Sequence, residues 1–423
     1  MPPVADLPDG TGPAGLPAVT PLNEPREGTP DVVADPAGLA RACDALAAGM
    51  GAVAVDTERA SGYRYWPKAY LVQLRRQGSG THLIDPAALD GDLRPLIQVL
   101  NDIPWVLHAA SQDLPCLEEL DLRPPELFDT ELAGRLAGYH RVALGTMVEL
   151  LLGYRLEKGH SAADWSTRPL PTAWLNYAAL DVELLLPLRE KLEAELAEQG
   201  KLAWAVEEFE AVRTAPPPEP KAEPWRRTSG VHKVRTPRAL AAVRALWQAR
   251  DELARNRDRA PGRVLPDSAI VAAATEGPRT IEQLRALPVF GGRMQRKLSA
   301  MWLSHIRIAQ ELPTSELPSP SPANGGPPPP NRWADRDPEA AARLAATRAA
   351  LNELATSHRL PVENLLSPDL VRRLCWEPPE DSDMTSVAAH LAERGARRWQ
   401  TELTADLLSR ALKAAAPAST APG

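Results

Sequence analysis

The chain has 423 residues, of which 44% are hydrophobic and 24% charged, a balance typical of folded, water-soluble proteins. This length exceeds what one hydrophobic core ordinarily serves, so we expect two or three domains. No stretch approaches the roughly 18 consecutive apolar residues of a membrane helix, and the first residues lack the basic and apolar segments of a signal peptide. The composition therefore argues against a secreted or membrane-spanning protein.

The three cysteines, Cys43, Cys116 and Cys375, are odd in number and widely spaced. They form neither a disulfide framework nor the ligand pattern of a zinc site. This usage predicts a protein of the reducing cytoplasm.

The net charge of -7 argues against a nucleic-acid partner when it is taken as a single number. Its distribution is uneven, however. Residues 30–212 carry 16 basic and 28 acidic side chains, whereas residues 225–312 carry 17 basic and 7 acidic ones. A cationic segment therefore follows an anionic one.

Proline marks the expected joints between domains, with 44 in all and dense runs at the N-terminus and over 215–224 and 318–331. The predicted divisions, in chain order, are a disordered arm (1–29), a first domain (30–212), a linker (213–228), a helical domain (229–313), a second linker (314–333), a second helical domain (334–415) and a disordered tail (416–423).

Four apolar runs of β type occur in the first domain, at residues 51–56, 70–75, 81–85 and 105–109. Helical periodicity then continues almost unbroken, and the segment from Thr172 to Leu196 predicts one long helix. These patterns indicate an α/β or α+β domain. The two later domains show leucine and alanine at helical spacing without alternating runs, so we expect small helix bundles.

Asp56 and Glu58 stand two residues apart at the end of the first apolar run, so both carboxylates should point to one face of a strand. Such a pair is repulsive unless a hard cation such as Mg²⁺ or Mn²⁺ lies between the two groups. The same spacing also occurs by chance at solvated strand ends. The pair therefore needs further acids to indicate a metal site.

Two further segments supply such acids. Asp113 follows the fourth apolar run, where the chain leaves the sheet and enters a helix. Tyr177 and Asp181 are spaced four residues apart, which places a phenol and a carboxylate on one helix face. That face is otherwise apolar, so a charge there is costly to bury unless it is paired. Asp113 alone is equally typical of an ordinary helix start.

The segments VAVDTE, HAASQDL and YAALD resemble, in this order, the three motifs of the DEDD exonucleases in their tyrosine-containing subclass. Phe128-Asp129-Thr130 and the segment SAADWSTRPL at 161–170 are similar to bacterial ribonuclease D. The resemblance covers almost the whole first domain. It implies a ribonuclease H-like (DnaQ-like) α/β fold with a mixed sheet, followed by two all-α bundles.

The resemblance also implies phosphodiester hydrolysis at a free 3′ end with two divalent cations, Mg²⁺ or Mn²⁺. Asp56, Glu58, Asp113 and Asp181 would hold the cations. Tyr177 would orient the attacking water, because a phenol with a pKa near 10 is a poor base. The resemblance places Asp129 off the metals as support.

Several neighbouring side chains have two interpretations. His108 either shapes the floor of the site or is a hydrogen-bonded core residue. Lys158, Trp165 and Arg168 either contact phosphate and bases or belong to a structured loop in which Trp165 packs in apolar surroundings and Arg168 pairs with Asp164. Arg59 departs from the apolar or aromatic residue that the resemblance to ribonuclease D implies after the acidic pair, which argues against a wedge packed on the terminal base.

Residues 229–313 resemble the helicase-and-RNase-D C-terminal (HRDC) domain, through segments such as LWQAR and RVLPD. Their cationic side chains are candidates for a phosphate-binding surface or for an ordinary solvated face. These candidates are Arg255, Arg257, Arg259, Arg263, Arg293, Arg296 and Lys297. The last domain occupies the place of a second HRDC-like domain, and with 12 basic and 14 acidic residues from 313 onward it predicts little phosphate contact.

The leading hypothesis is a metal-dependent 3′-to-5′ exoribonuclease. Its expected substrates are RNAs with a free single-stranded 3′ end, tRNA precursors among them, and its products are nucleoside 5′-monophosphates. A DNA exonuclease of repair would use the same chemistry, and nothing in the sequence measures recognition of the 2′-hydroxyl. An inert nucleic-acid-binding adaptor is the third hypothesis. It would bind without cleaving.

Overall fold

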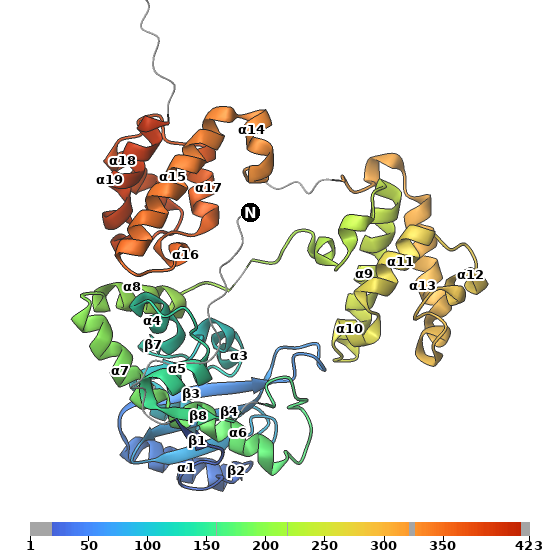
Figure 1. The fold of residues 1–423 in the computed structure, drawn as a ribbon. Helices are drawn as coiled ribbons and strands as arrows, with labels where there is room; N and C mark the ends of the chain where they lie inside the picture. Colours follow the sequence, from blue (N-terminus) through green and yellow to red (C-terminus); the bar gives the residue numbers. More distant parts are fainter. Residues whose placement is uncertain (1–18, 158, 218, 321–325, 416–423) are drawn as a thin grey trace, which may run out of the picture.

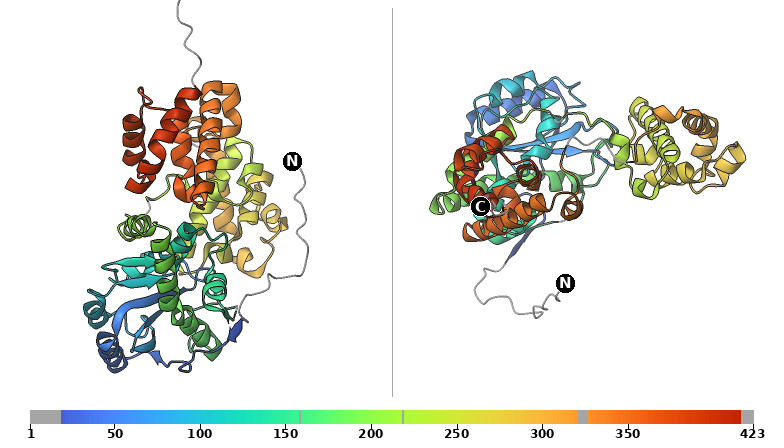
Figure 2. Two further views of the ribbon diagram at one scale, coloured as in Figure 1. Left: turned by 60° about the vertical axis from the view of Figure 1, so that its left-hand side comes forward. Right: turned by 90° about the horizontal axis from the view of Figure 1, so that it is seen from above.

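The computed structural model describes residues 19–157, 159–217, 219–320 and 326–415. It has three parts (Figure 1): an α/β part that contains all the described strands, and two helical parts that follow it in the chain. Seen from above, the first helical part, α9 to α13, stands to one side of the stack formed by the other two (Figure 2). Within the described ranges, none of the helices combines the length and apolar character that a membrane crossing needs.

A six-stranded mixed sheet of order β2-β5-β4-β3-β6-β7 is the centre of the α/β part. β3 and β4 are antiparallel, whereas β3, β6 and β7 run parallel to one another. The mixed α/β prediction is therefore confirmed. The strands of this sheet are β2 (Val32–Val33), β3 (Met50–Arg59), β4 (Ala69–Gln77), β5 (Gly80–Ile84), β6 (Trp105–Leu107) and β7 (Leu127–Asp129).

Sequence reasoning found the runs that contain β3, β4, β5 and β6 but missed β2 and β7, which are two and three residues long. Runs this short carry no measurable alternation, because a period of two needs several residues to become visible. The strand β6 also has three residues, but the apolar run 105–109 extends beyond it.

Residues 20–22 form β1, which pairs in parallel with β8 (Tyr154–Leu156) in a separate two-stranded sheet. The prediction that the whole arm 1–29 is disordered is therefore wrong for its last part. The guanidinium of Arg26 lies 4.6 Å from the ring centroid of Tyr154 and pairs with Glu183, which holds the segment in place. The rest of the predicted arm, 1–18, and the tail 416–423 lie outside the described residues.

Both faces of the sheet are covered by helices. Val53 and Val55 of β3 pack with α1 and α2 on one face, and Ala54 packs with α4, α5 and α7 on the other. Asp56 and Glu58 continue the alternation of Ala54 and point to that second face. The helices of this part are α1 (Pro36–Ala48), α2 (Arg94–Leu100), α3 (Leu114–Glu118), α4 (Thr130–Ala137), α5 (Leu144–Leu152), α6 (Thr172–Glu183), α7 (Leu185–Glu198) and α8 (Leu202–Arg213).

The single helix predicted from Thr172 to Leu196 is divided into α6 and α7 at Leu184, whose φ of -106° and ψ of 3° are not helical. Pro187 accounts for the break. It has no N–H to donate, and its ring would clash with the carbonyl of residue 183 in a continuous helix. In the first turn of α7 a missing N–H costs nothing, because those groups lack helical partners.

The first helical part has one core cluster that includes Leu246, Trp302 and Phe290. Trp225 is 3% exposed and packs into this cluster, so the end of the predicted linker 213–228 belongs to the bundle. The bundle consists of α9 (Pro237–Asn256), α10 (Pro261–Val264), α11 (Asp267–Glu276), α12 (Ile281–Ala286) and α13 (Arg293–Glu311).

The second helical part packs on α8, and its core forms one continuous apolar cluster with that of the α/β part. Trp333 is fully buried in this cluster, and the first α-helix of this part begins there, at the last residue of the predicted linker 314–333. Helical bundles were predicted for both later parts and are confirmed. The second contains α14 (Trp333–Arg336), α15 (Pro338–Ser357), α16 (Val362–Leu365), α17 (Pro368–Trp376), α18 (Met384–Glu393) and α19 (Arg398–Ala414).

Candidate active site

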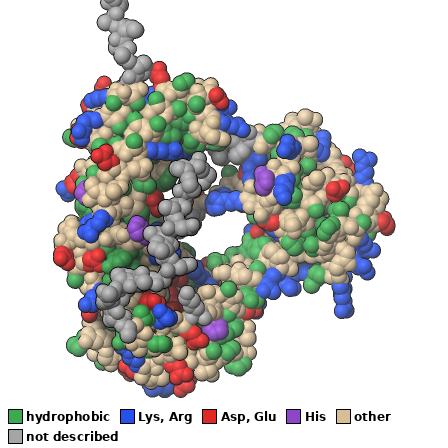
Figure 3. Space-filling model, in the orientation of Figure 1, with side chains coloured by type: hydrophobic (Ala, Val, Ile, Leu, Met, Phe, Trp, Pro, Cys, Tyr) green, Lys and Arg blue, Asp and Glu red, His purple; other side chains and the backbone are tan. Residues whose placement is uncertain are grey.

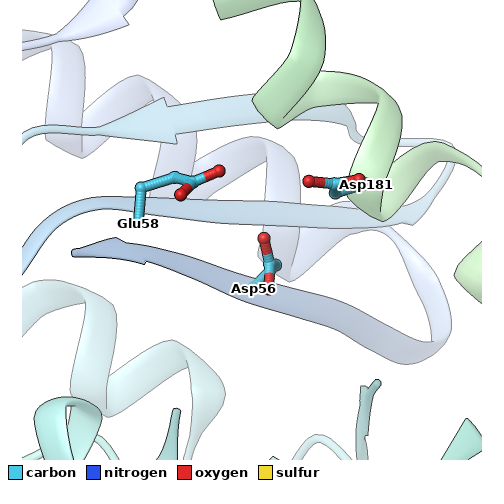
Figure 4. A group of neighbouring side chains, drawn as sticks. All are labelled: Asp56, Glu58 and Asp181. Carbon is cyan, nitrogen blue, oxygen red and sulfur yellow. The ribbon is translucent and has the colours of Figure 1, made fainter. Parts of the chain in front are cut away.

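Three carboxylates meet above the end of β3. Asp56 and Glu58 project from the strand, and Asp181 projects toward them from α6 (Figure 4). One oxygen atom of each lies within 4.8 Å of one oxygen of the other two. An all-oxygen, anionic donor set of this kind suits a hard divalent cation such as Mg²⁺ or Mn²⁺. The residues present therefore fit a divalent metal centre.

Asp113 lines the same cavity, of about 310 Å³, but lies outside the group of three. Its Oδ1 atom accepts a hydrogen bond of 2.7 Å from the Thr57 hydroxyl and lies 3.5 Å from Nη2 of Arg59. Both contacts use Oδ1. They leave Oδ2 without a hydrogen-bond partner in the described part of the chain, so it is available as a further metal ligand.

Burial and mutual repulsion disfavour the ionised form of the four carboxyl groups in this cavity. Burial and the neighbouring carboxylates raise the pKa of Asp56 well above its usual range and that of Glu58 to about 11. Burial is the main cause for the other two, with the pKa of Asp113 raised to about 6 and that of Asp181 to about 7. A bound cation would remove this cost, because it favours the charged form of each ligand.

The backbone before Asp113 is fixed by Asp129, which is the last residue of β7 and the N-cap of α4. Its carboxylate accepts hydrogen bonds from the N–H groups of Ala109, at 3.0 Å, and Ala110, at 2.8 Å. Ala109 has a φ of 59°, a left-handed conformation that is unfavourable for alanine without such support. Asp129 therefore positions the turn that carries Asp113 and lies outside the group of three carboxylates.

Tyr177 lies one helical turn before Asp181 and lines the same cavity, where burial and the charges of Asp181, Glu58 and Asp56 contribute to the raised pKa of its phenol. Its ring packs beside Trp165, with ring centroids 6.4 Å apart. Burial is the main reason why the pKa of the phenol lies above its usual range, so the group is protonated at neutral pH and available as a hydrogen-bond donor.

Comparison with known proteins agrees with this geometry. A family model described as 3′-5′ exonuclease matches residues 30–197, an HRDC domain model matches residues 239–306, and a model described as the 3′ to 5′ exonuclease C-terminal domain matches residues 326–412. Ribonuclease D of Acidiphilium cryptum is 32% identical over 80% of this chain and 84% of its own length. The chain belongs to the ribonuclease D family. It is accordingly a 3′-to-5′ exoribonuclease.

Solved structures extend the likeness to more than nine-tenths of the chain. A protein from Bifidobacterium adolescentis is 40% identical over 93% of this chain and 100% of its own, with a TM-score of 0.87. Escherichia coli RNase D, described as an exoribonuclease involved in structured RNA processing, is 28% identical over 91% of this chain and 98% of its own, with a TM-score of 0.66.

His108 lines the cavity of this ribonuclease D but behaves as a buried, hydrogen-bonded residue. Its Nδ1 atom lies 2.9 Å from the Thr130 hydroxyl, and burial lowers the pKa of its imidazole to about 4. The ring is therefore neutral at physiological pH. It shapes the floor of the cavity without adding positive charge.

The structure decides between the two interpretations of the 161–170 segment. Trp165 has no exposed surface and packs under α6, so the prediction that it stacks on a base is wrong. Arg168 directs its five N–H donors to Asp85 and to the carbonyls of Tyr70, Trp165 and Thr167. No donor is left for phosphate, and its acidic partner is Asp85 rather than the expected Asp164. Lys158 lies outside the described residues.

Two of the cations predicted to contact RNA lie against the α/β part instead. Arg255 approaches the Tyr65 hydroxyl and pairs with Asp251 at 3.1 Å. Arg263 donates to the Gly62 carbonyl and lies over the ring of Tyr63, 4.0 Å from its centroid. Residue identity carries no signal for this, because it does not show which face of a bundle touches a neighbouring domain.

The remaining candidate cations of the bundle are exposed and have no acidic partner within the described ranges. They are Arg257, Arg259, Arg293, Arg296 and Lys297. Blue side chains of this bundle reach into the opening that separates it from the rest of the molecule (Figure 3). The bundle therefore keeps part of its cationic surface available to a polyanion.

Sequence reasoning assigned no role to Thr57 or Gln112, both of which line the cavity. The available signal for Thr57 is its position between Asp56 and Glu58, on the opposite face of β3, from which its hydroxyl reaches Asp113. Gln112 contributes its backbone carbonyl to Arg59, and backbone contacts leave no trace in residue identity.

Proposed function

We propose that this chain removes nucleoside 5′-monophosphates one at a time from RNA with a free single-stranded 3′ end, in a reaction that requires divalent cations. The observation that carries the proposal is the convergence of Asp56, Glu58 and Asp181 to within 4.8 Å in one cavity. Burying these carboxylates together costs free energy, and a purely structural site would not require such a cluster.

Asp56, Glu58, Asp113 and Asp181 would hold two cations, Mg²⁺ or Mn²⁺. Bound divalent ions activate water as a nucleophile and stabilise negative charge on the leaving 3′ oxygen. The carboxylates fix the positions of the ions. Asp113 supplies its oxygen from a turn held by Asp129, so its placement does not depend on the metal.

Tyr177 would orient the attacking water through its phenol O–H. Its packing beside Trp165 restricts the ring, and its position one turn before Asp181 puts it in the same cavity as the carboxylates. Replacing it with phenylalanine keeps the ring and removes only the hydroxyl. We therefore expect Tyr177→Phe to lower kcat by about 10²- to 10⁴-fold, the usual range for a positioned proton-handling group.

Structured RNAs, tRNA precursors among them, are the proposed physiological substrates. The exposed cations just after α9 and in α13, such as Arg257 and Lys297, would bind the RNA backbone outside the cavity. We propose that the enzyme acts in the cytoplasm, where its free cysteines Cys43, Cys116 and Cys375 stay reduced.

The test uses matched RNA and DNA oligomers labelled at the 5′ end, incubated with Mg²⁺, Mn²⁺ or EDTA. The proposal predicts a stepwise ladder from RNA with metal, no shortening in EDTA, and no ladder from Asp181→Asn, which keeps the shape of the side chain. Faster shortening of DNA would make the protein a DNA exonuclease. Equal RNA binding by wild type and Asp181→Asn, with no shortening under either metal, would make it a binding adaptor.

A further inference from the structure

Arg59 is the last residue of β3 and follows directly after Glu58. Its side chain lines the cavity that contains the four acids, and among the described residues that line this cavity it is the one lysine or arginine. His108 is neutral there, as described above. Arg59 therefore supplies the permanent positive charge of the site.

The Arg59 guanidinium is held in position by two contacts but has further hydrogen-bond donors that these contacts do not use. Nη1 donates to the Gln112 carbonyl, and Nη2 lies 3.5 Å from Oδ1 of Asp113, a long distance for a charge-assisted hydrogen bond. Within the described chain these contacts occupy two of the five N–H donors of the group. The side chain keeps 26% of its surface exposed. Donors are thus free on the cavity side for a second, anionic partner.

Charge balance indicates which partner that is. Four carboxylates and two divalent cations sum to zero, so a phosphodiester entering the loaded site brings one uncompensated negative charge. A guanidinium matches the non-bridging oxygens of a phosphate in charge and in its planar fork of donors. The residue at the end of the metal-binding strand has that chemistry.

We propose that Arg59 binds the phosphate of the terminal linkage, the one to be hydrolysed, and so positions it over the metal centre. This inference rests on the proposed function and deepens it. Arg59 would keep its contact with the Gln112 carbonyl while its free donors bind the phosphate. Asp113 would then be held by Thr57 and the cations.

The test compares two fluorescent RNA oligomers that differ only at the terminal linkage, a phosphodiester in one and an uncharged methylphosphonate in the other. Binding is measured in Ca²⁺, under conditions in which the oligomers stay intact. Wild type should prefer the charged linkage by about 10- to 100-fold, as expected for a hydrogen bond to a charged group. Arg59→Gln should bind the two oligomers within about twofold of each other.

Arg257→Gln is the matched control, because it removes one exposed arginine that does not line the cavity. It should weaken binding of both oligomers equally and leave the preference intact. Arg59→Lys, which keeps the charge but loses the fork, should retain part of the preference. Thermal stabilisation of each variant by Mn²⁺ reports separately on the metal site, and it should be unchanged in Arg59→Gln.

Two results would overturn the inference. An Arg59→Gln variant that discriminates between the linkages as well as wild type would show that the phosphate is bound elsewhere. Loss of Mn²⁺ stabilisation with the preference intact would reduce Arg59 to a support for Asp113. If wild type with Mg²⁺ fails to shorten the natural oligomer at all, the proposed function fails first, and the inference fails with it.

Discussion

The two helical parts are attached to the α/β part by contacts of different chemistry. On the side of the second bundle, the indoles of Trp204 in α8 and Trp399 in α19 stack with centroids 5.0 Å apart. Trp399 is 1% exposed, and its Nε1 atom donates to Glu208 at 3.0 Å. The apolar core passes through this contact without interruption.

The HRDC bundle is attached by the loop 60–68, between β3 and β4, through mostly polar contacts. The Tyr65 hydroxyl donates to Asp251 at 3.1 Å, and Asp258 accepts from the backbone N–H groups of Tyr65 and Trp66 at 3.2 and 3.3 Å. Tyr65 is the only side chain of the α/β part in the bundle's apolar cluster, within the described residues.

This difference separates a fixed part from a movable one. Water and salt replace polar contacts at little cost, whereas parting an apolar contact exposes surface at about 25 cal/mol per Å². We infer that the second bundle and the α/β part form one stable unit. The HRDC bundle, which has the exposed cations, is the part able to move relative to the cavity.

The largest expected effect comes from breaking the apolar contact with Trp399→Ala. This change leaves a cavity and deprives Glu208 of its donor, so it should lower the free energy of unfolding by about 3–5 kcal/mol in urea denaturation. Val206→Ala, at an exposed position of the same helix α8, is the control and should change it by less than about 0.5 kcal/mol. Similar losses in both variants would contradict a continuous core.

A pH-dependent effect of intermediate size should arise at the same interface from Lys201. The residue is 4% exposed and its ammonium donates to the Leu136 carbonyl at 2.8 Å, and burial, with a smaller contribution from Arg359, lowers its pKa to about 8. The folded pKa lies below the unfolded value near 10.4, so the unfolded chain binds more protons between these two values. Stability attributable to this group therefore rises as the pH increases from about 8 to 10.5.

The measurement compares wild type with Lys201→Met by urea unfolding at pH 7.5 and pH 10. The difference between the two proteins should shift in favour of wild type at the higher pH by on the order of 1–3 kcal/mol. Taking the difference cancels the tyrosines and other lysines that titrate in the same range. A shift in the opposite direction would mean that the charged form is the one stabilised by folding.

The smallest expected effect concerns the polar contact between the loop 60–68 and the HRDC bundle. Asp258→Ala removes the acceptor for the N–H groups of Tyr65 and Trp66, so their amide hydrogens should exchange about tenfold faster. Glu252→Ala, at an exposed position of α9, should leave the exchange rates unchanged. If Asp258→Ala instead lowered global stability as much as Trp399→Ala, the HRDC bundle would be a fixed part too.

The central strands and both bundles were predictable, because long alternating runs and leucine at helical spacing record which face is buried. The carboxylates were predictable for a related reason. Asp56 and Glu58 are fixed relative to each other by the pleat of one strand, and Tyr177 and Asp181 by one helical turn. Local geometry of this kind can be predicted directly from the spacing of residues along the chain.

Several of the errors occurred where the outcome depends on a distant partner. The segment 20–22 is a strand because β8 offers it an edge, and Arg168 pairs with Asp85 because the fold brings residues 83 positions apart together. Arg255 and Arg263 appear in sequence as members of a cationic surface, yet their position against the loop 60–68 is a property of how two domains meet.

The sequence by itself thus determined the fold class, the acids and the family of this enzyme, since each follows from spacing within one segment or from matching motifs. The tertiary structure alone decided that three of the acids approach to 4.8 Å, that Arg59 joins them, and which bundle is held by apolar packing. Such features arise from contacts between residues far apart in the chain, and no local pattern encodes the distance between them.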